Sequence, residues 1–175
     1  MFSIKTVTMK FDPLEDRLKM DCSDNYKNTQ RLWLTKRLLD RLVPSVANQL
    51  EAKSTNKISI ELEQSFEQEK AEITKTKAKS VKLIKNNPTW LVSSVKVTKS
   101  KHDFKFLFIE EQKIDIDKKI TYQNRAEFDL AIPNLRQWLN ALFKIYKKAE
   151  WDTNFFPNWI KDKDKIIMTD EKIIN

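Results

Sequence analysis

The stretch VTMKFDPLEDRLKMDC, residues 7–22, shows the pattern that decides the fold at the N-terminus. Apolar and polar side chains alternate on both sides of a break at residues 12–16, which contains Pro13. Alternation places successive side chains on opposite faces of a strand, and a Pro/Asp-rich break between two such runs is typical of a β-hairpin. We therefore expect an antiparallel hairpin over residues 4–22. Its apolar face is formed by Val7, Met9, Phe11, Leu18, Met20 and Cys22.

After residue 29 the apolar spacing becomes helical. Apolar residues recur every three or four positions up to Leu50, which predicts an amphipathic helix over about residues 30–52. Thr29 is a suitable N-cap, and Pro44 predicts a kink or a restart of this helix. A weaker helical pattern follows at Ile58, Leu62, Phe66 and Ile73.

Residues 90–132 have the alternation of strands again. Three phenylalanines stand on one face of the same run, after a turn at residues 100–103: Phe104, Phe106 and Phe108. Apolar pairs at Ile114/Ile116, Ile120/Tyr122 and Phe128/Leu130 extend the strand pattern. A strong amphipathic stripe then predicts a helix over residues 133–150, with Pro133 in its first turn.

This order of elements indicates an α+β fold, in which an antiparallel sheet is covered by the two helices. The sheet combines the N-terminal hairpin with the strands at about residues 90–132, and the helices span about residues 30–52 and 133–150. We expect a single α+β domain over residues 1–160 and a charged C-terminal tail over residues 161–175.

The chain of 175 residues contains no glycine, although average usage predicts roughly 12. Glycine allows the backbone to approach a phosphate closely and to adopt positive φ without steric cost. The phosphate-binding GxxxxGK[ST] loop, the dinucleotide-binding GxGxxG turn and the GxSxG nucleophile elbow are therefore excluded.

Catalytic and metal-binding residues are scarce. His102 is the single histidine and sits in the expected turn, while Cys22 lies on the apolar face of the hairpin. Asp115 and Asp117 alternate with isoleucines, as on the solvent face of a strand. A zinc site lacks its usual ligands, and a cysteine nucleophile would need a histidine partner. We expect no enzyme activity, no metal and no cofactor; the alternative is a magnesium or calcium site, or an enzyme, that uses carboxylates alone.

The chain is basic, with 33 Lys and Arg against 25 Asp and Glu and a net charge of +8. Lysine outnumbers arginine, as AT-rich codon usage favours, so part of this charge reflects composition. Four of the six arginines nevertheless lie within residues 17–41. We expect a basic helix face that contacts phosphate or an acidic partner, since guanidinium groups bind such anions bidentately. It comprises Arg31, Lys36, Arg37 and Arg41. Alternatively, these side chains pair internally with Asp40, Glu15 and Asp16.

Aromatic residues follow the last predicted helix in an irregular segment: Trp151, Phe155, Phe156 and Trp159. They either cover the core or form an exposed patch that binds a partner. We expect a non-enzymatic protein-interaction or assembly subunit, with this segment as its partner surface. The alternative is a nucleic-acid-binding module that uses the basic helix face and the Lys-rich connector at residues 75–85. The single cysteine and the lack of a signal peptide or membrane span predict a cytoplasmic location.

Two segments, EDRLKMDC at residues 15–22 and RLWLTKRLLDRLVPSV at residues 31–46, resemble the opening of an uncharacterised family of short proteobacterial proteins. Members of that family have a DRL-type strand followed by a WLT[KR]R helix. The C-terminal stretch LRQWLNALFKIYKKAEW is compatible with the same family. The resemblance implies a bacterial source and no known activity.

Overall fold

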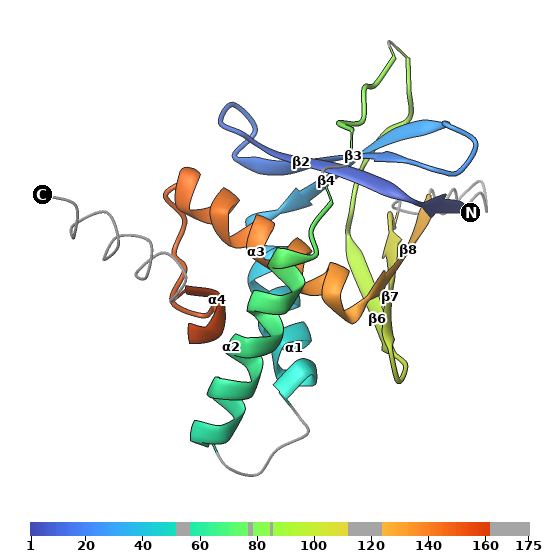
Figure 1. Ribbon diagram of the computed structural model, residues 1–175. Helices are drawn as coiled ribbons and strands as arrows, with labels where there is room; N and C mark the ends of the chain where they lie inside the picture. Colours follow the sequence, from blue (N-terminus) through green and yellow to red (C-terminus); the bar gives the residue numbers. More distant parts are fainter. Residues whose placement is uncertain (52–56, 77–78, 85, 112–123, 162–175) are drawn as a thin grey trace, which may run out of the picture. The chain divides into compact units, whose positions relative to one another are not determined.

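The computed structural model describes residues 1–51, 57–76, 79–84, 86–111 and 124–161 (Figure 1). These residues form eight strands and four helices, which confirms the α+β class. The expected strands around residues 114–122 and the tail from residue 162 lie outside the described residues.

The chain divides into two compact units. Unit 1 comprises residues 1–42 and 77–131, and unit 2 comprises residues 43–76 and 132–175. Each unit is therefore built from two separate stretches of the chain. The single domain expected over residues 1–160 stays a prediction.

The N-terminal hairpin of unit 1 is confirmed. Strands β2 (Thr6–Asp12) and β3 (Arg17–Ser23) are antiparallel, with Met9 opposite Met20. Leu18, Met20 and Cys22 of β3 are all buried, as the alternation predicted. In the turn, the Asp12 carboxylate accepts hydrogen bonds from the Leu14 and Glu15 amides at 3.1 and 3.3 Å. Aspartate stabilises turns in this way, by binding backbone amides a few residues further on.

The prediction of a helix from residue 30, capped by Thr29, is wrong at its beginning. Residues Thr29–Thr35 form strand β4, antiparallel to β3, and helix α1 spans Lys36–Glu51. The N-cap is Thr35, whose Oγ1 accepts a hydrogen bond from the Leu38 amide at 3.2 Å. Leu32 and Leu34 are compatible with either period, and their pairing opposite Met20 and Leu18 decides for the strand. The helix continues through Pro44.

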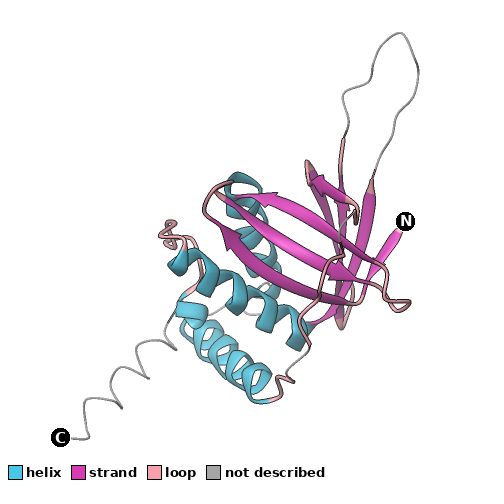
Figure 2. Ribbon diagram, turned by 90° about the horizontal axis from the view of Figure 1, so that it is seen from above, coloured by secondary structure: helices cyan, strands magenta, loops and turns pink. Residues whose placement is uncertain are grey.

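The strands of unit 1 form two four-stranded sheets, shown in magenta in Figure 2. One has the order β2-β3-β4-β5, in which β5 (Thr89–Leu91) is parallel to β4. The other has the order β1-β8-β7-β6. Its strands are β1 (Phe2–Ile4), β8 (Arg125–Ala131), β7 (Asp103–Ile109) and β6 (Ser94–Lys99). The three phenylalanines predicted to share a face of β7 are buried.

Two short crossings connect these sheets. The Lys5 amide, between β1 and β2, donates to the Ser23 carbonyl at 2.8 Å. Between β5 and β6, the amides of Val92 and Ser93 donate to carbonyls of β4 and β7, respectively, each at 2.9 Å. The N-terminal hairpin and the later strands therefore lie in different sheets, joined where the chain passes from one to the other.

Unit 2 is helical. It contains α2 (Lys57–Ile73), α3 (Ile132–Lys148), the short α4 (Asn158–Lys161) and the part of α1 from Val43 onward. Helix α3 has Pro133 in its first turn, as expected. Its apolar stripe is buried: Leu135, Trp138, Leu139, Leu142, Phe143 and Tyr146.

Candidate interaction surface

The aromatic segment after α3 contributes mainly to the interior of unit 2. Phe156 and Trp159 are buried, while Trp151 and Phe155 are half-buried. The Tyr146 ring makes edge contacts with Trp151, Phe155 and Phe156, at centroid distances of 4.9, 5.6 and 5.2 Å. This edge-to-face geometry is the favoured arrangement of packed aromatic side chains. Of the two alternatives for this segment, Phe156 and Trp159 therefore follow the first, in which the aromatic side chains cover the core.

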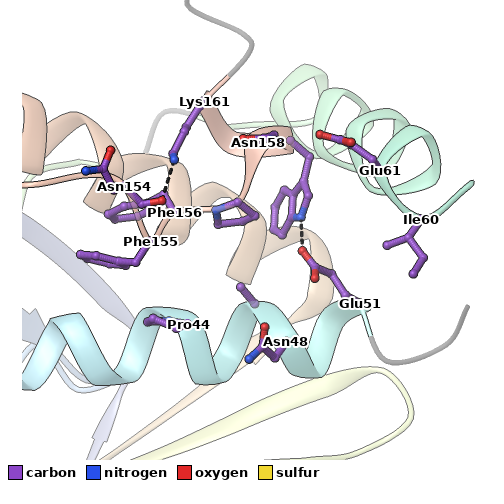
Figure 3. A pocket seen from close by; sticks show the side chains of 13 residues that line it. Pro44, Asn48, Glu51, Ile60, Glu61, Asn154, Phe155, Phe156, Asn158 and Lys161 are labelled. Carbon is purple, nitrogen blue, oxygen red and sulfur yellow. Dashed lines mark hydrogen bonds between the residues drawn. The ribbon is translucent and has the colours of Figure 1, made fainter. Parts of the chain in front are cut away.

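Part of the same segment lines an open pocket of about 390 Å³ (Figure 3). Phe155, Phe156 and Trp159 lie on one side, and residues of α1 and α2 lie on the other. The Trp159 indole Nε1 donates to the Glu51 carboxylate at 2.7 Å, and Lys161 Nζ donates to the Asn154 carbonyl at 2.8 Å. The two charged groups that border the pocket at these points are therefore engaged within unit 2.

The structure separates the four residues of the predicted basic helix face. Arg31 lies on β4, where its Nε and Nη2 donate to the Asp21 carboxylate at 2.7 and 3.0 Å. This bond to Asp21 raises the pKa of Arg31. Lys36, on α1, pairs with Asp40 at 2.6 Å. The prediction that Arg31 shares a helix face is wrong, because residues 29–35 form a strand.

Arg37 and Arg41 remain as the exposed members of that set. Both lie in the part of α1 that belongs to unit 1, four residues apart and thus on one side of the helix. Among the described residues, neither forms an ion pair within 4.0 Å. The predicted internal pairing with Asp40 is observed for Lys36.

Cys22 and His102 lie where the sequence predicted. Cys22 is completely buried, and this burial raises the pKa of its thiol far above the usual value, so the nucleophilic thiolate is suppressed. His102 is exposed in the turn between β6 and β7, which is closed by a 2.8 Å hydrogen bond from the Ser100 amide to the Asp103 carbonyl. In the described part of the chain, no three His, Cys, Asp or Glu residues are grouped to hold a metal. Asp115 and Asp117 lie outside that part.

The feature that sequence reasoning missed is the orientation of α2. Its polar face is buried and carries Gln64 and Gln68, together with Ala71. Three large apolar side chains are exposed instead: Leu62 by 64%, Phe66 by 69% and Ile73 by 77%. At about 100° per residue these three side chains lie within roughly 40° of one another, on one side of the helix. We call this set the α2 stripe.

Hydrogen bonds to α3 explain why the glutamine face points inward. The buried Arg136 guanidinium donates to the Gln64 carbonyl at 3.3 Å and to the Gln64 side-chain oxygen. Gln68 Nε2 donates to the Arg136 carbonyl at 3.2 Å, and Gln137 Nε2 donates to the Ala71 carbonyl at 2.6 Å. The Arg136 guanidinium also lies over the Trp159 ring, 5.1 Å from its centroid. Gln64 supplies polar partners for the buried guanidinium, while Gln68 binds the backbone carbonyl of the same residue.

Comparison of the chain with known protein families, with curated proteins and with solved structures finds no match. None of the described helices has the length and apolar character that a membrane crossing requires. The candidate interaction surface therefore rests on the geometry of this chain. Within its described residues, the α2 stripe is the exposed apolar feature with a regular helical spacing.

Proposed function

We propose that this protein is a non-enzymatic interaction subunit that holds a protein partner on the α2 stripe. The single observation that carries this proposal is the exposure of Leu62, Phe66 and Ile73 along one side of a regular helix. Single exposed apolar side chains are common on protein surfaces, whereas contiguous ones mark partner sites.

The size of the effect supports a docking role. Fully burying one Leu, Ile or Phe side chain contributes on the order of 1.5–3 kcal/mol. The three side chains are about two thirds exposed, so covering them would release on the order of 3–6 kcal/mol before the entropic cost of association. Association itself costs on the order of 4–15 kcal/mol, so the stripe supplies a central apolar contribution to which contacts around it must add.

The aromatic segment supports this surface from inside. Trp159 lies under Arg136, and Arg136 binds Gln64 on the buried face of α2. Removing the chain after Ala149 would delete buried Phe156 and Trp159, and we expect that truncation to unfold unit 2. Point substitutions in the exposed stripe are therefore the sharper test.

A photo-crosslinking residue at position 66, introduced in the native host, tests the proposal. We expect a discrete protein adduct that is lost when Leu62 and Ile73 are both replaced by serine, since a partner must seat on the whole stripe. The matched control places the same residue at Leu14, which is 96% exposed in the β2–β3 turn. Equal adducts at positions 66 and 14, or an adduct unaffected by the two serine substitutions, would overturn the proposal.

Nucleic-acid binding is the second candidate function, supported by the exposed pair Arg37 and Arg41. Two phosphate contacts predict that affinity for a single-stranded oligonucleotide falls about sevenfold between 50 and 200 mM salt. We expect a variant with both arginines replaced by serine to lose this dependence. Absence of binding at the lower salt concentration would remove this candidate.

A further inference from the structure

We infer that the partner segment that occupies the α2 stripe is a basic amphipathic helix of another protein. This inference rests on the proposed function, because it specifies the partner of the same surface. Three properties of α2 lead to it: its shape, its charge and the position of Glu69.

The shape of the stripe suits a helix. From Leu62 to Ile73 the rise is about 17 Å, or three helical turns. Residues Lys57–Ile73 form a regular helix, so this surface offers no strand edge to which an extended peptide could add. A helix with apolar side chains at positions i, i+3, i+4 and i+7 matches a straight stripe of this length.

The charge around the stripe is acidic. Helix α2 contains five Glu and two Lys, in a chain whose net charge is +8. Glu63 and Glu69 flank the stripe on opposite sides and are exposed, as is Glu67; Lys70 is the exposed basic neighbour. No Lys or Arg nitrogen of the described residues lies within 4.0 Å of these three carboxylates. A partner with Lys and Arg beside its apolar residues complements this surface.

Glu69 argues against a second copy of this chain as the occupant. It lies between Phe66 and Ile73 along the helix, at the margin of the stripe. In a symmetric pairing of two α2 helices, each Glu69 would be buried in an interface whose flanks carry the same negative charges. Burying an unpaired carboxylate is costly, and like charges across an interface add to that cost.

The test uses two 14-residue peptides with blocked termini as probes. Both have Leu at positions 3, 6, 7 and 10, and the remaining positions are all Lys in one peptide and all Glu in the other. We expect the Lys peptide to bind the full-length protein at least tenfold more tightly, as measured by fluorescence anisotropy, and this preference to shrink as salt is raised. Replacing both Glu63 and Glu69 by Lys should reverse the preference.

Controls separate this inference from the proposed function. Phe66→Ser should weaken binding of the Lys peptide at least tenfold, while Leu14→Ser should leave it unchanged; circular dichroism of both variants checks that they fold. Equal binding of the two peptides, or binding of neither, would overturn the basic helix, while the crosslink at position 66 still decides the proposed function. A dimer that is lost in Phe66→Ser, measured by sedimentation, would assign the stripe to a second copy and overturn the inference.

Discussion

Helices α2 and α3 both contain 17 residues and belong to the same unit, yet α3 buries its apolar stripe and α2 exposes its own. Helix α3 buries its apolar stripe, including Leu139 and Leu142, whereas α2 buries two glutamines and exposes Leu62, Phe66 and Ile73. The difference teaches that the polarity of the neighbouring helix, as well as apolar spacing, selects the face that turns inward. Arg136 of α3 favours the inward orientation of Gln64 on α2, because a buried guanidinium needs oxygen acceptors.

Arg136 is an unusual group for a helix interface. Its burial lowers the pKa of the guanidinium, and the nearby charges of Glu67 and Glu63 oppose this effect. Within the described residues, its hydrogen-bond acceptors are the side-chain and backbone oxygens of Gln64 rather than a carboxylate. Glu67 and Glu63 therefore partly offset the effect of burial on the Arg136 pKa, and they also make the exposed side of the helix acidic.

The largest expected effect is on the apolar face of α3. Leu139→Ala should lower the free energy of unfolding by about 2–5 kcal/mol, because Leu139 is completely buried and its truncation leaves a cavity. The matched substitution on α2, Leu62→Ala, should change it by less than about 0.5 kcal/mol. Urea unfolding followed by tryptophan fluorescence measures both variants. Similar losses in the two would show that Leu62 is packed in solution and would remove the contrast between the helices.

An intermediate effect is expected where the two helices meet. Gln64→Leu should lower the free energy of unfolding by about 1–3 kcal/mol, since the buried Arg136 guanidinium loses its side-chain acceptor. Gln68→Met, on the same face, keeps the volume. It removes the bond to the Arg136 carbonyl but also a buried amide oxygen that has no hydrogen-bond partner among the described residues, so the loss should be smaller. Denaturation curves of the two variants measure the difference. Equal losses would argue that packing, rather than the guanidinium, orients α2.

The smallest effect concerns the indole that supports Arg136. Trp159→Phe removes the hydrogen bond to Glu51 and should lower the free energy of unfolding by about 1 kcal/mol. In a background that carries Glu51→Ala, the same substitution should cost less, because the hydrogen bond is already absent. A double-mutant cycle in urea measures the coupling. If the cost is unchanged in that background, the indole acts through packing alone.

Elements with an unambiguous period were predictable from the sequence. Strand β3 of the hairpin, the phenylalanine face of β7 and the stripe of α3 have the burial that their spacing predicted, whereas the apolar side chains of β2 are only half-buried. Residues 29–35 were not predictable in this way, because Leu32 and Leu34 fit a helix that continues to Leu50 equally well. Pairing with β3 resolves this ambiguity in favour of a strand. The local spacing of apolar residues does not reveal that pairing.

The candidate site was predictable only in part. The sequence drew attention to the aromatic segment and to four basic residues, because aromatic side chains and arginines are frequent at interfaces. Burial then placed Phe156 and Trp159 inside unit 2, and Asp21 and Asp40 engaged Arg31 and Lys36. The spacing of Leu62, Phe66 and Ile73 was visible as a helical pattern, but spacing alone does not distinguish a buried stripe from an exposed one.

The sequence by itself determined the α+β class, the hairpin, the helical character of residues 57–73 and 132–148, and the exclusion of glycine-dependent phosphate sites. These follow from local periodicity and composition, which act between residues close in the chain. The tertiary structure alone decided that residues 29–35 pair as a strand and that the strands divide into two sheets. It alone decided that α2 turns its glutamines inward. These outcomes depend on pairing partners outside the element itself. Residues 29–35 pair with the preceding strand β3, and Gln64 binds Arg136, 72 residues further along the chain. Such contacts arise only once the chain has folded.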